Sequence, residues 1–557
     1  MGLETEHGFS VLDPQGNRLD QGEQLERLLR AARGQWSHIR GKSSHDLYLE
    51  TGARFYVDCG QHPEWATPEV TNPWDAVRYL KAGHRVLETL VQRLERDPGI
   101  GEVVMSRCNV SYGPTQTTFG KHESYSFTGD FDAIPGQLIP FLVSRVIFGA
   151  GGFTASPGIE FTLSPRSHHI VKTVSGSSTE ARGLFHTKQE SLSQGQYQRV
   201  HILCGDSLCS DLGNWITTGT TALVIAAVEA GAYPGRDLRL HNPVATLHRF
   251  ARDPTCRTAK AFLMDGSSMS ALDIQRHYCR CVGAHAHAWS MPDWAGEVHA
   301  RWEELLERLE RAPESVTCTL DAPMKLAVFR NHVKRRSFNW DRLTDWNLAL
   351  GILHQGMEHT GSESGPLIAE ATSGQRGPLA DRVKAMKSFL RRRHLSWDQL
   401  EAFLSLRAEL QEIDTRWTQL GPKGIFRHIE ASRPSALDHA VPGVDHIEDA
   451  AVHPPRDTRA AIRGAQVKEL AAKKRGTFGC SWEYILDYER GRMLNMADDP
   501  FATTAQWEDT RESDELGRLL DMSIDDHVLH LHFQRLRRLH EARRRRGEEA
   551  ETLTLPF

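Results

Sequence analysis

One stretch near the N-terminus does most to decide the fold and the location of the chemistry: Thr51-Gly52-Ala53-Arg54-Phe55-Tyr56-Val57-Asp58-Cys59-Gly60-Gln61-His62-Pro63-Glu64. Thr51-Gly52 predicts a turn, and the run Arg54–Val57 predicts a short strand. Because side chains alternate along a strand, Tyr56 and Asp58 share one face. The chain then turns through Gly60 and Pro63 and presents Glu64.

Asp58 stands at a strand end beside a glycine turn, where catalytic groups often lie. It can act as a base or a nucleophile, with Glu64 as a metal ligand. The alternative is that Asp58 only forms the turn, as aspartate commonly does. Spacing alone leaves both interpretations open.

A second acidic segment, Gly2-Leu3-Glu4-Thr5-Glu6-His7-Gly8, predicts a strand over residues 2–9. Glu4 and Glu6 would lie on the same face of it. Glutamate is disfavoured in strands, so metal coordination would explain the pair. An exposed edge strand with solvated acids is the alternative.

A third segment, Phe119-Gly120-Lys121-His122-Glu123-Ser124-Tyr125, places Glu123 and Tyr125 on one strand face. Arg145, Arg166 and Arg199 stand in short strand contexts. Each can reach a phosphate or carboxylate through a bidentate hydrogen bond. The alternative for each is a structural or surface arginine.

No phosphate-binding loop of the form G-x-x-x-x-G-K-[ST] occurs, and the glycines at 149–152 lack dinucleotide-binding spacing. If the protein uses ATP, the phosphates must be held in another way. Divalent metal ions on carboxylates, assisted by arginine, are the remaining common solution.

Composition limits the class of protein. The 557 residues are 39% hydrophobic and 25% charged, with a net charge of −5. A chain of this length predicts at least two domains in a soluble globular protein. The near-balanced charge argues against nucleic acid or a membrane surface as a partner.

Features that mark export or membrane insertion are lacking in the sequence. The nine cysteines are irregularly spaced without a C-x-x-C pair, which argues against a zinc ribbon or a disulfide framework. The acidic N-terminus and the lack of a long apolar run argue against a signal peptide or a membrane span. A cytoplasmic enzyme is expected.

Three regions are predicted along the chain. Residues 1–431 form a catalytic domain, mixed α and β at first and mainly helical from Ala271 to about Leu420. Residues 432–457, rich in Pro, His, Asp and Ala, form a linker. Residues 458–557 form a small C-terminal domain that ends in a charged helix over 534–551, whose arginine run predicts a solvated face.

The acidic segments, in this order, resemble the family of Pup ligases and depupylases. The opening Gly2–Gly8, the motif Thr51–Asp58 with His62–Trp65, and Gly120–Tyr125 carry the resemblance. Weaker similarity continues to about residue 505 through these segments: Pro140–Arg145, Gly205–Ser207, Gly219–Val224, Leu272–Arg276, Gly424–Phe426, Thr458–Gly464 and Asp499–Phe501.

The resemblance implies an α+β fold: a large glutamine-synthetase-like domain of the carboxylate–amine ligase type, whose curved antiparallel sheet packs on helices and cradles ATP, plus a small C-terminal domain. It implies Asp58 as the catalytic residue and ATP and Mg²⁺ as cofactors. The metal ligands would be Glu4, Tyr56 and Glu64, with Glu123 as a further candidate. The cofactor-binding residues would be Arg54, Arg145, Arg166 and Trp482.

The implied reaction joins the γ-carboxylate of a C-terminal glutamate on a Pup-like modifier protein to a lysine of a protein substrate. ATP first phosphorylates the carboxylate, and the lysine, deprotonated with the help of Asp58, then attacks. The partners would be the modifier, lysine-bearing substrates and, indirectly, the proteasome, with neither nucleic acid nor a membrane.

Two branches of the family remain as alternatives. The interval Phe9–Thr51 lacks the long insertion of depupylases and favours a ligase, whereas Pro68–Pro73 and Gly219–Ala222 are closer to a depupylase. Another carboxylate–amine ligase or an inactive binding protein is the second alternative. The sequence departs from the family at two places. Arg107-Cys108-Asn109-Val110-Ser111 stands where the family has K-N-N-T-D, and Thr187-Lys188-Gln189-Glu190-Ser191-Leu192 stands where it has T-R-D-E-P-H.

Overall fold

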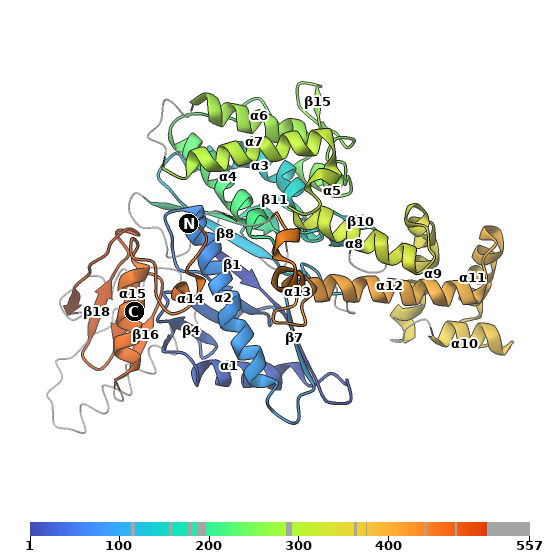
Figure 1. The fold of residues 1–557 in the computed structure, drawn as a ribbon, viewed down its shortest axis with the longest axis horizontal. Helices are drawn as coiled ribbons and strands as arrows, with labels where there is room; N and C mark the ends of the chain where they lie inside the picture. Colours follow the sequence, from blue (N-terminus) through green and yellow to red (C-terminus); the bar gives the residue numbers. More distant parts are fainter. Residues whose placement is uncertain are drawn as a thin grey trace, which may run out of the picture.

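The stretch of sequence quoted first contains β5 (Arg54–Val57) and the start of β6 (Pro63–Ala66). These are two neighbouring strands of a nine-stranded sheet in the computed structural model (Figure 1). Gly52 lies in the turn between β4 (Asp46–Leu49) and β5 and takes a φ of +76°, which suits glycine. The structure describes residues 1–112, 117–154, 159–176, 181–186, 197–285, 292–360, 365–374, 376–438, 441, 443–473 and 476–509.

The sheet is antiparallel except for its last pair, β11 and β12, which run parallel. In spatial order its strands are β11 (Lys172–Ser175), β12 (Gly183–His186), β13 (Gln198–Gly205), β8 (Lys121–Phe127), β1 (Gly2–Glu6), β6 (Pro63–Ala66), β5 (Arg54–Val57), β4 (Asp46–Leu49) and β3 (His38–Arg40).

The predicted strand over residues 2–9 is two strands. β1 ends at Glu6, and β2 (Gly8–Leu12) pairs with β7 (Glu102–Ser106) in a separate two-stranded sheet. The break falls at His7, whose backbone N–H and ring Nδ1 both contact the carbonyl oxygen of Pro63. Burial lowers the pKa of His7 to about 3, so this ring is neutral.

Helices cover one face of the large sheet. Apolar side chains of β4, β5 and β6 pack on α1 (Gln21–Arg33) and α2 (Pro73–Leu94), and those of β8 and β13 pack on α3 (Ile134–Ser144) and α4 (Asp211–Glu229). α2 begins at Pro73, because the side chain of Asn72 accepts from the backbone N–H of Asp75 and Pro73 occupies the first turn.

The predicted helical region from Ala271 onward is confirmed. It continues in an arm that extends away from the sheet (Figure 1) and has its own apolar core. The remaining helices of the large domain are α5 (Pro243–Ala251), α6 (Ala271–His285), α7 (Ala295–Arg311), α8 (Asp321–Arg335), α9 (Asn347–Thr360), α10 (Gly365–Ser373), α11 (Ala380–Arg393), α12 (Trp397–Trp417) and α13 (Ile425–Ser432).

Short elements complete the large domain. The two-residue strands form two ribbons, β9 (Gly152–Phe153) with β10 (Phe161–Thr162) and β14 (Ala261–Phe262) with β15 (Ser268–Met269). Its 3₁₀ helices are η1 (Arg145–Phe148), η2 (Arg166–His169), η4 (Pro313–Val316) and η5 (Trp340–Trp346); a further one, η6 (Pro434–Ala436), follows in the predicted linker.

The predicted linker contains η6 and α14 (Ile447–Ala450), which packs on α2. A smaller unit follows at the left of Figure 1. It consists of α15 (Ala460–Ala471) and a four-stranded sheet of β16 (Phe478–Cys480), β17 (Tyr484–Asp487), β18 (Arg492–Asn495) and β19 (Trp507–Asp509). The charged helix predicted over 534–551 lies outside the described residues, and the domain boundaries stay predictions.

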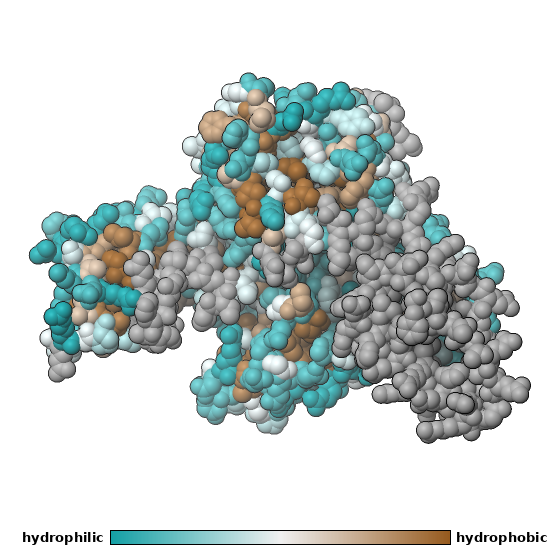
Figure 2. All heavy atoms as spheres, turned by 180° about the vertical axis from the view of Figure 1, so that it is seen from behind, coloured by the Kyte–Doolittle hydropathy of each residue, from teal (hydrophilic) through white to brown (hydrophobic). Residues whose placement is uncertain are grey.

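None of the described helices combines the length with the apolar composition that crossing a bilayer requires. Seen from behind, the hydrophobic side chains on the described surface form separate patches with hydrophilic side chains between them (Figure 2).

Candidate active site

The face of the large sheet that is turned away from α1–α4 carries the acids. Strand register brings polar side chains from four strands together on this face. Glu6 of β1 lies opposite Glu64 of β6, and Glu64 lies opposite Tyr56 of β5. On the other side, Glu4 lies opposite His122 of β8. Residues far apart in the sequence therefore form one polar cluster.

Distances show how closely the cluster is packed. Nδ1 of His122 lies 3.5 Å from Oε2 of Glu4 and 3.8 Å from Oε1 of Glu64. Arg199 of β13 donates to Oε1 of Glu4 at 3.1 Å. The carboxylates are thus near enough to one another to need positive charge between them.

The pKa values of the carboxylates diverge. Burial, and then the charges of Glu4 and Glu6, raise the pKa of Glu64 well above its usual value. Burial also disfavours ionised Glu4, but the His122 hydrogen bond and Arg199 outweigh it and lower its pKa. The cluster therefore favours protonated Glu64 unless another cation is present.

A divalent cation fits this site. Oε1 of Glu64 is buried and has no hydrogen-bond partner among the described groups. Ligand atoms of Glu4, His122 and His201 lie within 4.8 Å of one another. Carboxylate oxygens are the ligands that hard divalent cations prefer, and a cation would remove the repulsion that raises the pKa of Glu64.

His122 and His201 differ in what they can offer. Nη2 of Arg166 lies 3.0 Å from Nε2 of His122, and because a guanidinium only donates, that nitrogen accepts. The proton of His122 then sits on Nδ1 and faces the carboxylates. Burial and Arg199 lower the pKa of His201 well below its usual value, so His201 is the neutral ring available to a metal.

Arg166 reaches this face from η2. Its Nη1 lies 3.4 Å from Oε2 of Glu6, and its Nε donates to the carbonyl oxygen of Leu203 at 2.8 Å. A Cβ at residue 120 would lie 2.5 Å from Cδ of Arg166, so Gly120 is needed for the arginine to pass. Arg166 therefore lies beside the acids, and its predicted contact with the cofactor stays a prediction.

Asp58 follows β5 directly. Its Oδ1 accepts from the backbone N–H of His62 at 2.6 Å, and its Oδ2 lies 3.2 Å from Nδ1 of the same residue. Ligand atoms of Glu6, Asp58 and His62 lie within 4.8 Å of one another. Asp58 therefore forms the turn and also lies beside the acidic cluster, so the two interpretations are compatible.

Arg54 and Trp482 lie farther along the same face, at the junction with the smaller unit. Arg54 pairs with Asp46 through two hydrogen bonds of 2.6 and 2.9 Å, and its guanidinium lies 4.0 Å from the Tyr56 ring centroid. Trp482 packs edge-on against Tyr48 with ring centroids 5.5 Å apart. These flat groups form a surface suited to stacking a nucleotide base.

Glu123 and Arg145 do not join the cluster. Because His122 shares the face of Glu4, its neighbour Glu123 points to the helix-covered side, where it is fully buried. There Nη1 of Arg145 lies 2.8 Å from Oε2 of Glu123 and also contacts Thr217 and Thr221 of α4. The structure gives these two residues a buried ion pair instead of the metal and nucleotide contacts expected for them.

Two members of the site, His122 and His201, were not assigned to it from sequence. Alternation with Glu4 already put Glu6 on the right face. Arg199 and His201 stand two residues apart on β13 and so share one face of that strand. Only the pairing of β13 with β8 brings this face close to Glu4.

The fold and the site define an α+β protein whose sheet carries a buried cluster of carboxylates, with arginines and histidines, on the face opposite its helices. The model of the Pup-ligase protein family matches residues 1–354 and 381–486. Because the match covers most of the 557 residues, the chain belongs to the Pup-ligase family.

Relatives in both branches of the family are similar to the chain. The Pup–protein ligase of Xylanimonas cellulosilytica is 35% identical over 61% of this chain and 76% of its own length. Pup–protein ligase 1 of Rhodococcus erythropolis is 33% identical over 61% and 75%. The Pup deamidase/depupylase of Mycobacterium tuberculosis is 34% identical over 53% of this chain and 60% of its own length.

Solved structures share the fold. The ligase PafA in complex with the prokaryotic ubiquitin-like protein Pup aligns with a TM-score of 0.67 at 20% identity, over 93% of this chain and 91% of that chain. PafA in complex with ADP aligns with a TM-score of 0.63 at 21% identity, over 90% and 93%. The expected α+β fold with a large sheet and a small C-terminal unit is confirmed.

Proposed function

We propose that this chain is an ATP- and Mg²⁺-dependent carboxylate–amine ligase that attaches a Pup-like modifier to lysines of protein substrates. The convergence of Glu4, Glu6 and Glu64 beside Asp58 carries the proposal. The Pup–protein ligases named above and the two PafA structures support it.

The residues divide into two tasks. Glu4, Tyr56, Glu64 and His201 would hold Mg²⁺, which when bound neutralises phosphate charge. Arg166 and Arg199 add positive charge at the same face, where a transferring phosphoryl group needs it.

Asp58 is placed for proton transfer. A lysine amine with a pKa near 10.4 must lose a proton before it attacks an acyl phosphate. Asp58 lies at the edge of the acidic cluster, and its two contacts with His62 keep its carboxylate in place. It can therefore accept this proton as general base.

The test is direct. Purified protein with ATP, Mg²⁺ and a Pup ending in glutamate should form ADP and a conjugate with a lysine-bearing substrate. Asp58→Asn should abolish the conjugate, whereas Asp13→Asn should not. Asp13 is a matched control because its carboxylate also accepts backbone N–H groups in a turn, at 2.8 and 2.9 Å, but it lies outside the site.

A depupylase is the second candidate, because a depupylase relative is nearly as similar as the ligases. The interval Phe9–Thr51 lacks the long insertion of depupylases, which favours the ligase. Conversion of a Pup ending in glutamine to the glutamate form, without a conjugate, would favour the depupylase. Failure to bind nucleotide would favour a binding protein.

A further inference from the structure

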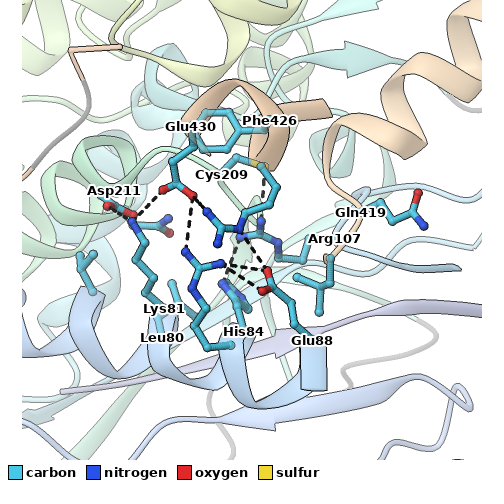
Figure 3. A pocket seen from close by; sticks show the side chains of 15 residues that line it. Leu80, Lys81, His84, Glu88, Arg107, Cys209, Asp211, Gln419, Phe426 and Glu430 are labelled. Carbon is cyan, nitrogen blue, oxygen red and sulfur yellow. Dashed lines mark hydrogen bonds and ion pairs between the residues drawn. The ribbon is translucent and has the colours of Figure 1, made fainter. Parts of the chain in front are cut away.

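A second polar pocket lies on the helix-covered side of the sheet, formed by α2, α4 and α13 (Figure 3). It is partly open to solvent. None of its lining residues belongs to the candidate active site. Four cations and three carboxylates line it: Lys81, Arg85, Arg107, Arg427, Glu88, Asp211 and Glu430.

Three of the cations neutralise the three carboxylates. Nζ of Lys81 lies 2.5 Å from Asp211 and 2.8 Å from Glu430. Arg85 and Arg427 each pair with both Glu88 and Glu430, at 2.9 to 3.6 Å. The pocket is left with one excess positive charge, which belongs to Arg107.

Arg107 is the unusual member. It is 9% exposed, and among the described residues no carboxylate pairs with it. Its Nη1 contacts Nδ1 of His84 at 3.2 Å and the carbonyl oxygen of Leu208 at 3.1 Å, and its Nη2 contacts Sγ of Cys209 at 3.6 Å. Its Nε is buried and has no partner among the described groups.

The groups that contact Arg107 directly supply no negative charge. Since the guanidinium donates to His84, that ring must be neutral, and burial followed by Arg107 lowers its pKa well below the usual value. Burial raises the pKa of Cys209 to about 12, so it remains a thiol. The carboxylate of nearby Asp321 instead accepts from the backbone N–H groups of Cys209 and Ser210.

A buried cation without a counter-ion is costly, and its cost falls when an anion binds. We propose that this pocket binds a small oxyanion of the phosphate type, either inorganic phosphate or the phosphoryl group of a phosphomonoester. The guanidinium fork of Arg107 would supply the directed donor, and the excess charge of the pocket would supply the attraction. This assignment does not depend on the proposed ligase activity.

Isothermal titration calorimetry of the full chain with sodium phosphate, at constant ionic strength, tests the proposal. Arg107→Met should weaken binding at least about tenfold, because one close charge in a partly buried site contributes more than 1.4 kcal/mol. Arg107→Lys keeps the charge but loses the fork, and should bind with intermediate affinity.

Glu430→Gln should change the affinity in the opposite direction. It raises the excess positive charge of the pocket, so it should tighten phosphate binding by about tenfold. This variant decides the outcome even if Arg107→Met does not fold. The matched control is Arg311→Gln, which removes a cation that is 82% exposed and lies outside the pocket; it should have no effect.

Phosphoserine, titrated in parallel, distinguishes the two sources. Tighter binding of phosphate supports the free anion, and tighter binding of phosphoserine supports a phosphomonoester. The proposal is overturned if neither compound binds or if Glu430→Gln fails to tighten binding. It is also overturned if the heat of binding survives in Arg107→Met but is lost in Arg199→Gln, because the anion would then bind at the sheet face.

Discussion

Glu69 joins the two units of the chain and offers a quantitative test of the structure. Its carboxylate, 20% exposed, bridges two arginines of the smaller unit that are almost fully buried. Arg459 Nε lies 2.8 Å from Oε1, and Arg463 contacts both oxygens while it also donates to the carbonyl oxygen of Gly52. Glu69→Gln would remove the charge with little change in shape.

The magnitude follows from the pKa of Glu69. Burial alone would raise this pKa, but Arg463 and Arg459 outweigh burial and lower it from 4.5 to about 2. Each pKa unit corresponds to about 1.4 kcal/mol, so the ionised carboxylate contributes about 3 kcal/mol at neutral pH. Glu69→Gln should lower the free energy of unfolding by roughly this amount, as for other broken buried ion pairs.

Urea denaturation of Glu69→Gln and wild type at pH 7, followed by tryptophan fluorescence, measures the difference. Glu469→Gln is the control, because Glu469 lies on α15, as Arg463 does, and pairs with Lys473 at 2.8 Å on the surface. Exposed pairs of this kind contribute about 0.5 kcal/mol or less. Equal losses for the two variants would refute the reasoning.

The interaction of Glu69 with its two arginines also predicts how stability changes with pH. A carboxylate whose pKa is lowered on folding stabilises the folded state fully above the unfolded pKa of 4.5. The difference between wild type and Glu69→Gln should therefore shrink as the pH falls from 4.5 towards 2. A difference that stays constant across this window would also contradict the assigned interaction.

Further predictions concern the site and the core. Glu4→Gln should raise the Mg²⁺ concentration for half-maximal ATP turnover at least about tenfold, because the acidic cluster loses one negative charge; an unchanged midpoint would argue against a metal at Glu4. Gly83→Ala should destabilise the fold by about 1–3 kcal/mol in a thermal melt, since a Cβ there would lie 2.2 Å from Nε1 of Trp65; a higher melting temperature would show that the tryptophan can move. Asn72→Ala should cost about 1 kcal/mol by the same measurement through loss of the α2 cap, and an unchanged melt would contradict that role.

Local patterns predicted the elements of the site well. The strand β5 and the turn at Gly52 follow from short-range chemistry and are confirmed. The break at His7 was missed, because it depends on contacts with Pro63, which lies 56 residues away in the sequence.

Faces within a strand were also predictable. Strand alternation correctly paired Glu4 with Glu6, Tyr56 with Asp58, and Glu123 with Tyr125, because a two-residue period is a property of the backbone alone. Alternation does not say which side of the sheet a given pair will occupy.

The sequence by itself therefore determined the α+β class, the acidic strands and the family to which the chain belongs. Only the tertiary structure decided that Glu64 faces Glu6, that Glu123 turns to the helices with Arg145, and that Arg166 reaches the acids past Gly120. The physical reason is that strand register and the choice of buried face are set by long-range pairing and by where the apolar side chains pack.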